Sequence, residues 1–241
     1  MRAAAALLVL ALTLTGCETN EERHAALVRQ DRRAAHATPP QSGLVVGRES
    51  RYVKVLQTTV LHDENGVAAV VSLRNDSAHA LHEVPIAVTL HEPGGRTLYQ
   101  NNLPGLSTPL THAPLLMPGQ NFEWIDDQIP ASGTPGSLSA RVGEAPTTGP
   151  HPPSVAVTGL HVFDDPTNGI GAEGTVVNRS SVAQQELVVF AVGTRAGRIV
   201  AAGRAVLPLA SANSSTPFQV FFIGNPKRAS LQASAPPTTL G

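Results

Sequence analysis

The stretch Val84-Pro85-Ile86-Ala87-Val88-Thr89-Leu90-His91 places a large apolar side chain at every second residue. Successive side chains of a β-strand point to opposite faces of the sheet, so a period of two is typical of a strand that lies on a core with one face and meets solvent with the other. Residues 67–73 alternate in the same way, as do Phe122 and Trp124 further along the chain. The pattern predicts an all-β fold.

Turn signals and composition agree with this prediction. Asn65-Gly66 and Gly94-Gly95 supply residues that tolerate the positive φ angles of tight hairpins. The 241 residues include 21 glycines and 20 prolines, whereas aromatic residues make up only 4%. Many turns and short strands suit this mixture better than long helices do.

An internal repeat links two strand-rich blocks. Asn65-Gly66-Val67 matches Asn168-Gly169-Ile170, and Asn75-Asp76-Ser77 matches Asn178-Arg179-Ser180, in each case 103 positions further along. A loop shorter by one residue then shifts the offset to 102. At that offset the matched residues are Ile86, Val88 and Leu90 with Val188, Phe190 and Val192, and Gly95-Arg96 with Gly197-Arg198, while Phe122 has a counterpart in Phe218. Order, spacing and alternation together predict a duplicated unit.

The duplicated unit resembles a known family. A strand ending in Asn-x-Ser, a loop, an alternating apolar strand and a Gly-Arg turn resemble the FxLYD-type family of small extracytoplasmic β-sandwich domains of bacterial envelope proteins. Of the name-giving motif, residues 88–92 keep the Leu and residues 190–194 keep the Phe. The resemblance covers roughly residues 52–128 and 154–225, and it implies a sandwich fold with an accessory role.

We therefore expect two small immunoglobulin-like β-sandwich domains in tandem, after a signal peptide and a tether. Gly, Pro, Ser and Thr dominate residues 131–153, which predicts an interdomain linker. The expected segments are a signal peptide at 1–16, a tether at 17–50 that can include a short helix, sandwich domains at 51–130 and 154–232, the linker at 131–153, and a flexible tail at 233–241.

The N-terminus predicts where the protein resides. Arg2 precedes an apolar run from Ala3 to Leu14 that fits a secretory signal and is shorter than the 20 or so apolar residues of a membrane span. Leu14-Thr15-Gly16-Cys17 resembles the lipobox of bacterial lipoproteins. This resemblance implies cleavage between Gly16 and Cys17 and a diacylglycerol on the Cys17 thiol, which would anchor the protein to the cell membrane facing outside the cytoplasm, on the extracellular face or in the periplasm. A plain secreted protein with an incidental Cys17, or an uncleaved anchor, is the alternative.

Charge and motifs predict little chemistry. The net charge is −1 and no basic patch points to nucleic acid as a partner. Among nine histidines, His79, His82 and His91 lie closest together, but zinc needs three or four convergent ligands and the second block has no matching histidines. We expect these three to be exposed, and the acidic pairs Asp126-Asp127 and Asp164-Asp165 to lie in turns. Neither a Gly-x-Ser-x-Gly elbow nor a phosphate-binding loop is present, so no catalytic residue and no cofactor is predicted.

These observations favour a lipid-anchored, non-catalytic envelope lipoprotein. It would act as a binding or scaffold module through sandwich loops or strand edges, since an exposed edge can accept an extended partner. Its expected partners are the membrane, through the lipid on Cys17, and an envelope protein or wall polymer. Two alternatives stay open: a solute- or metal-binding lipoprotein accessory to a transporter, and an envelope hydrolase that no motif reveals.

Overall fold

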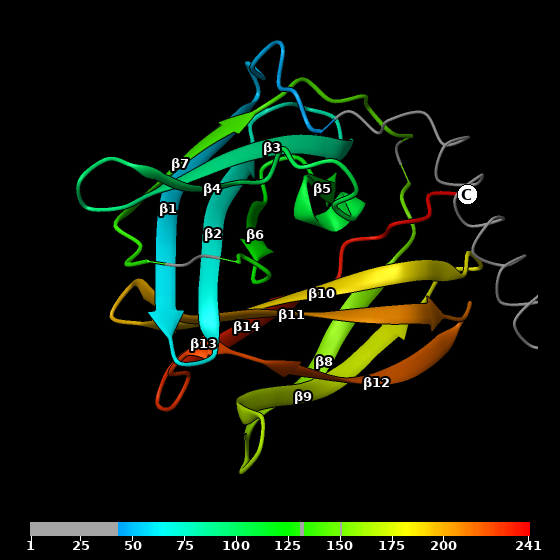
Figure 1. Ribbon diagram of the computed structural model, residues 1–241. Helices are drawn as coiled ribbons and strands as arrows, with labels where there is room; N and C mark the ends of the chain where they lie inside the picture. Colours follow the sequence, from blue (N-terminus) through cyan, green and yellow to red (C-terminus); the bar gives the residue numbers. More distant parts are fainter. Residues whose placement is uncertain (1–42, 131–132, 150) are drawn as a thin grey trace, which may run out of the picture. The chain divides into compact units, whose positions relative to one another are not determined.

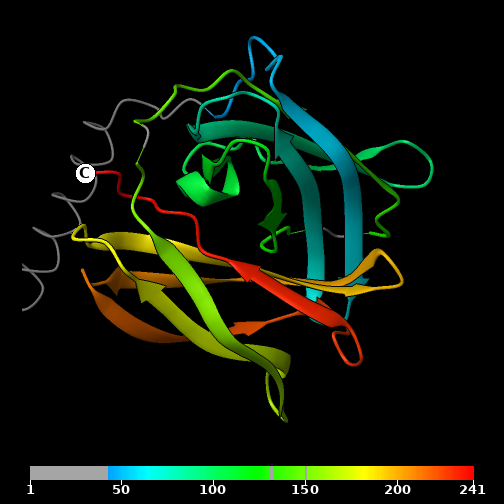
Figure 2. The same cartoon turned by 180° about the vertical axis from the view of Figure 1, so that it is seen from behind.

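The computed structural model describes residues 43–130, 133–149 and 151–241, and these residues form an all-β fold as predicted (Figures 1 and 2). The N-terminal repeat contains β1 (Val53–Asp63), β2 (Gly66–Asn75), β3 (Leu81–His91), β4 (Thr97–Gln100), the 3-10 helix η1 (Thr108–Leu110), β5 (His112–Leu116), β6 (Asn121–Asp126) and β7 (Ser137–Val142). The C-terminal repeat contains β8 (Val155–Asp165), β9 (Gly169–Asn178), β10 (Gln184–Arg195), β11 (Arg198–Ala210), β12 (Ser214–Phe221), β13 (Ile223–Gly224) and β14 (Ser230–Ser234). No helix among the described residues is long and apolar enough to cross a membrane.

The two repeats share one topology. The first sheet has the order β1-β2-β6 in the N-terminal repeat and β8-β9-β12 in the C-terminal repeat. In the second sheet β3 pairs with β4, β5 and β7, and in the same way β10 pairs with β11 and β14. All these pairings are antiparallel. The single strand β11 takes the place of β4 and β5, and β13 has no counterpart in the N-terminal repeat. The other strands correspond, which agrees with the internal repeat that the sequence predicts.

The predicted register of the repeat is wrong by one residue in β10. Glu83 and Glu186, 103 positions apart, both adopt positive φ angles, of 48° and 47°, near the start of β3 and β10. The offset therefore stays at 103 along this strand, and Ile86 corresponds to Val189 rather than to Val188. Sequence alternation cannot reveal this, because every residue from Leu187 to Gly193 is buried and a strand covered on both faces has no polar side to mark its register.

The counterpart of Phe218 also differs from the prediction. Trp124 pairs with Val71, and Phe218 pairs with Gly174, which is 103 positions after Val71. Phe218 therefore takes the place of Trp124 in the C-terminal repeat, while Phe122 lies two residues earlier on its strand.

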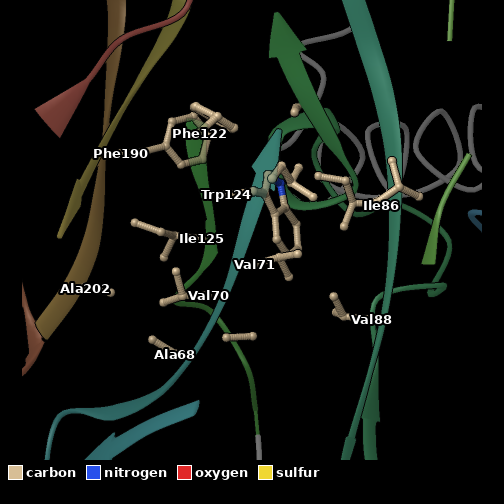
Figure 3. Packing of buried hydrophobic residues seen from close by; sticks show 14 of the residues in the cluster. Ala68, Val70, Val71, Ile86, Val88, Phe122, Trp124, Ile125, Phe190 and Ala202 are labelled. Atoms are coloured by element: carbon tan, nitrogen blue, oxygen red, sulfur yellow. The ribbon is translucent and has the colours of Figure 1, made fainter. Parts of the chain in front are cut away.

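The two repeats do not have separate cores. Leu187, Val189 and Ala191 of β10 face the core of their own repeat, whereas Val188, Phe190 and Val192 join the core cluster of the N-terminal repeat. In Figure 3, Ala68, Val70 and Ile125 point toward Ala202 of β11, while Val71 and Trp124 point toward Ile86 and Val88 of β3. Strands β2 and β6 are thus buried on both faces, whereas β1 is largely exposed. The repeats share a core rather than forming two independent domains.

Three segments outside the predicted domains are also ordered parts of the fold. Residues 137–142 of the predicted linker form β7, which pairs with β3 from Ile86 to His91. The end of the predicted tether contributes the buried Val46 and a bridge between Glu49 and Gly143. The predicted flexible tail begins within β14, and Thr238 and Thr239 donate their backbone N–H groups to the Gln184 side chain. Composition misled for β7 and β14 because these are edge strands, where half-exposed small and polar residues suffice.

The predicted signal peptide, Cys17 and the tether up to residue 42 lie outside the described residues.

Candidate functional site

A groove separates the two repeats between β6 and β14. Its larger section, of about 600 Å³, runs past the turn before β6, the start of β8 and the C-terminal prolines Pro236 and Pro237. A second section, of about 310 Å³, has Phe122, Phe190 and Val192 among its lining residues. Asn121, Phe122, Ala233 and Ser234 line both sections, so the two adjoin along the β6 and β14 walls.

Two edge strands, β6 and β14, contribute to the walls of this groove. Within the described residues β6 pairs only with β2, and β14 pairs only with β10. Neither strand makes a further backbone hydrogen bond beyond these ladders in that part of the chain. Backbone N–H and C=O groups at a sheet edge are donors and acceptors for an additional strand. An extended segment lying in the groove therefore meets such an edge on each side.

An aromatic pair joins the two repeats at the groove. Phe122 of β6 and Phe190 of β10 pack edge to face, with ring centroids 5.1 Å apart and an interplanar angle of 78°. This geometry is favourable for aromatic rings and contributes about 1 kcal/mol beyond burial of their area. The pair gives the groove an apolar lining next to the polar strand edges.

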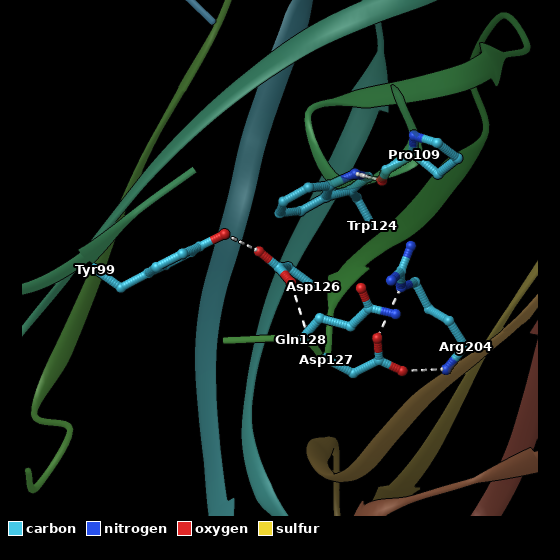
Figure 4. A network of polar contacts seen from close by, with 7 residues as sticks. All are labelled: Tyr99, Pro109, Trp124, Asp126, Asp127, Gln128 and Arg204. Carbon is cyan, nitrogen blue, oxygen red and sulfur yellow. Dashed lines mark hydrogen bonds and ion pairs between the residues drawn. The ribbon is translucent and has the colours of Figure 1, made fainter. Parts of the chain in front are cut away.

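A buried ion pair holds the repeats together beside the aromatic pair (Figure 4). Arg204 of β11 donates its backbone N–H and its Nε–H to the two carboxylate oxygens of Asp127, at 2.8 and 2.9 Å. The side chains of Arg204 and Asp127 are only 3% and 16% exposed. Asp63 adds a second link, because its Oδ2 accepts the backbone N–H of Gly224 at 2.7 Å. These contacts set the separation of the groove walls before any ligand arrives.

One carboxylate supplies most of the charge along the groove. Glu123 lines the second section, and Oε2 of its carboxylate accepts the Ser72 hydroxyl at 2.5 Å. Burial raises the pKa of Glu123, and the Ser72 hydrogen bond offsets this only in part. Among the residues that line the two sections, His151 is the only other one with a basic or acidic side chain.

Asp126 and Asp127 differ from the predicted turn. Asp126 is the last residue of β6 and is fully buried, where it accepts the Tyr99 hydroxyl at 2.8 Å and the Gln128 N–H at 3.1 Å (Figure 4). Burial raises the pKa of Asp126. It also raises the pKa of Tyr99, and the negative charge of Asp126 adds to that effect. Asp126 and Tyr99 thus form a buried polar pair within the N-terminal repeat.

Asp164 and Asp165 are the last two residues of β8 and so precede the turn in which they were predicted to lie. Asp165 Oδ1 accepts the backbone N–H groups of Thr167 and Asn168 at 2.8 and 2.9 Å, and these bonds lower its pKa. Asp164 forms an exposed ion pair with Lys227 at 2.8 Å. Neither aspartate faces other acidic ligands that a calcium site needs.

The three candidate histidines do not converge. His82 and His91 are nine residues apart on β3, which separates them by about 30 Å. His79 is exposed, and its carbonyl accepts hydrogen bonds from the side chains of Asn75 and Ser77. His91 is half-buried rather than exposed, and its Nδ1 is buried without a partner. Across the described ranges no three His, Cys, Asp or Glu side chains gather as metal ligands would.

A smaller pocket, of about 190 Å³, contains the nearest approach to acid–base chemistry. Glu83, His112 and Glu186 line it, and burial lowers the pKa of His112. His112 Nδ1 lies 2.8 Å from the hydroxyl oxygen of Thr111, but that hydroxyl donates to the Thr108 carbonyl at 3.0 Å. The Thr111 hydroxyl therefore has the Thr108 carbonyl as an acceptor in addition to the imidazole.

Sequence reasoning missed the groove, Glu123 and the Asp127–Arg204 ion pair. The unbroken apolar run of β10 was the signal that this strand is covered on both faces, but it does not name the second covering surface. A comparison with protein-family models found no match, and a comparison with curated proteins found none either. The groove is thus assigned as the candidate site on geometry alone.

Proposed function

We propose that this protein is a lipid-anchored, non-catalytic binding module of the bacterial envelope, and that it holds an extended segment of a partner protein in the groove between β6 and β14. The observation that supports this proposal is a groove with an unpaired strand edge on each side and an apolar lining. Backbone pairing would supply affinity, and the groove side chains would supply selectivity.

The fixed contacts between the repeats favour such binding energetically. Asp127, Arg204 and the Phe122–Phe190 pair hold the groove walls in place without a ligand. A preformed site loses less conformational freedom on binding than one that must be assembled. The remaining entropic cost is that of ordering the partner segment. Unstructured segments that become ordered on binding bear this cost.

The groove is tested by filling it. In the full mature chain, Gln232→Trp places a large ring at an exposed β14 position that lines the groove, and Gln219→Trp is the matched control at an exposed β12 position. Selection from a random heptapeptide library should enrich peptides that bind the wild type and the control but not Gln232→Trp. Amide exchange should slow at residues 121–123 and 230–234 when the peptide binds.

Other results would overturn this proposal. Peptides that bind Gln232→Trp as tightly as the wild type, or protection confined to other strands, would place the interaction elsewhere. An empty selection together with a melting temperature raised by a metal ion or small solute would favour the accessory of a transporter, because a ligand that binds only the folded state raises the melting temperature. Turnover of a wall substrate would favour a hydrolase.

The lipid anchor is tested separately, at Cys17. Cys17→Ser removes the thiol that the lipobox resemblance assigns to the lipid, and two or more acyl chains are needed for stable anchoring. The wild type should sediment with membranes and carry the mass of a diacylglyceryl group, whereas Cys17→Ser should stay in the soluble fraction of the envelope. An unmodified thiol on the native protein would refute the anchor and leave a plain secreted protein.

A further inference from the structure

We infer that the groove selects an extended segment carrying a lysine or arginine, and that Glu123 is the residue that recognises the basic side chain. This inference rests on the proposed function of the groove. The inference adds the chemical class of the bound segment and the residue that recognises that segment.

Glu123 stands at the groove with an unsatisfied oxygen. Oε2 accepts the Ser72 hydroxyl, but Oε1 makes no hydrogen bond or ion pair with any described residue. Among the described residues no lysine or arginine lines either section of the groove, so this part of the chain supplies no cation there. A partly buried carboxylate without a cation is destabilised by desolvation, and the raised pKa of Glu123 has this cause. A cationic side chain of a ligand would remove that penalty.

The register of β6 directs the ligand side chain to this carboxylate. Glu123 pairs with Ser72 across the β2–β6 ladder, so both side chains lie on the same face of the sheet. A strand added along the other edge of β6 places one residue directly opposite Glu123 on that face, with Cβ atoms about 5 Å apart. Opposite charges at such cross-strand positions attract, and like charges repel.

The surroundings of Glu123 define the neighbouring ligand positions. The next ligand side chains on the same face are two residues away in either direction. Phe190 and Val192 line this section of the groove and favour apolar side chains there. The inferred ligand therefore alternates, with a basic residue flanked two positions away by apolar ones.

Three pentapeptides test the inference. They are Val-Thr-Lys-Thr-Val and the same sequence with Gln or Glu at the centre, each capped at both ends. The wild-type chain should bind the Lys peptide about tenfold more tightly than the Gln peptide, the size of a charge-assisted hydrogen bond, and the Glu peptide least. Isothermal titration calorimetry measures the three affinities.

Variants of Glu123 test whether this residue causes the preference for the Lys peptide. Glu123→Gln should bind the Lys and Gln peptides equally, and Glu123→Lys should prefer the Glu peptide. Glu173→Gln, which neutralises a half-exposed carboxylate on β9 outside the groove, should keep the wild-type preference. Fluorescence of Trp124, the single tryptophan, shows whether each variant stays folded.

The outcomes separate the inference from the function on which it rests. Equal binding of the three peptides by the wild type, or an unchanged preference in Glu123→Gln, would overturn the role of Glu123 and leave the groove as a binding site. Failure of all three peptides together with an empty library selection would overturn the proposed function, and the inference with it.

Discussion

The side chains of Asn75 and Asn178, 103 positions apart, make the same hydrogen bonds at the ends of β2 and β9. Each Nδ2 donates to the carbonyl four residues on, His79 or Val182, and to a second strand, at Leu116 or Ala210. Each Oδ1 accepts the backbone N–H and the hydroxyl of a serine two residues on, Ser77 or Ser180. The Asn-x-Ser motif therefore fixes the end of the second strand in both repeats, and we call this set of hydrogen bonds the Asn-x-Ser lock.

Removing the lock should destabilise the protein strongly. Asn178→Ala leaves backbone carbonyls without their donor in a site where the side chain is only 1% exposed. Because each buried unsatisfied polar group costs about 1–3 kcal/mol, we expect a loss of about 2–4 kcal/mol in the free energy of unfolding. Urea denaturation followed by Trp124 fluorescence measures it. The exposed Asn102→Ala is the control and should change stability by less than about 0.5 kcal/mol. Equal effects of the two substitutions would contradict the lock.

The ion pair between the repeats makes a second prediction. Arg204→Met leaves the Asp127 carboxylate nearly buried without its cation, which should cost about 3 kcal/mol of stability. The double variant Asp127→Ala with Arg204→Met should recover part of the loss, because no uncompensated charge remains. Arg198→Met, at an exposed hairpin position, is the control and should be nearly neutral. Urea denaturation of the wild type, the two single variants and the double variant measures these stabilities. A double variant no more stable than Arg204→Met would argue against a charge effect.

Buried Asp126 should make stability depend on pH. Its pKa is raised above the usual 3.8, first by burial, so the folded state binds a proton more tightly than the unfolded state does. Its contribution is then complete below the ordinary pKa and is lost as the pH rises through the raised folded value. Asp126→Asn removes this loss, so the stability of Asp126→Asn relative to wild type should fall as the pH is lowered from 7 to 4.

Asp165→Asn should show the opposite slope in the same titration. The N–H groups of Asn168 and Thr167 lower the pKa of Asp165, so its contribution is present above the ordinary pKa and is lost as the pH falls through the folded value. The stability of Asp165→Asn relative to wild type should therefore rise as the pH is lowered. Parallel slopes for the two variants would refute the assigned causes.

The internal duplication also predicts which face of the C-terminal repeat is protected from self-association. Val70 pairs with Ile125 on the face that packs against the other repeat, and the corresponding pair 103 positions after Val70 is Glu173 with Gln219. This second pair is hydrogen-bonded and solvent-facing, and Glu173 also contacts His161. Polar residues thus cover the face where a further repeat would dock, as in the end units of repeat proteins.

Restoring the apolar pair should expose a docking face. Glu173→Val combined with Gln219→Ile should give concentration-dependent self-association, because an apolar surface complementary to a second one forms an open-ended contact. Sedimentation velocity measures it across a concentration series. Glu64→Val with Gln100→Ile makes the same chemical changes at exposed positions of the N-terminal repeat and should leave the sedimentation coefficient unchanged. Association of both double variants to the same extent would mean that added hydrophobicity alone is responsible.

The candidate site was much less predictable than the strands. The alternation at residues 84–91 predicts β3 correctly, and the Asn-x-Ser match predicts the repeat. No local sequence pattern marks Glu123 as a site residue, because the groove that it lines is formed with β14, more than 100 residues away. The predicted linker hides β7, since an edge strand of small residues has the composition of a loop.

By itself the sequence determined the strand class and the duplication, because the period of two and the positions of turn residues are local properties of the chain. Only the tertiary structure decided that the repeats share a core, that β10 is covered on both faces, and that two strand edges flank one groove. The physical reason is that burial of a second sheet face depends on which distant surface covers it. A period of two reports that one face is apolar, and it carries no information about the partner of the other.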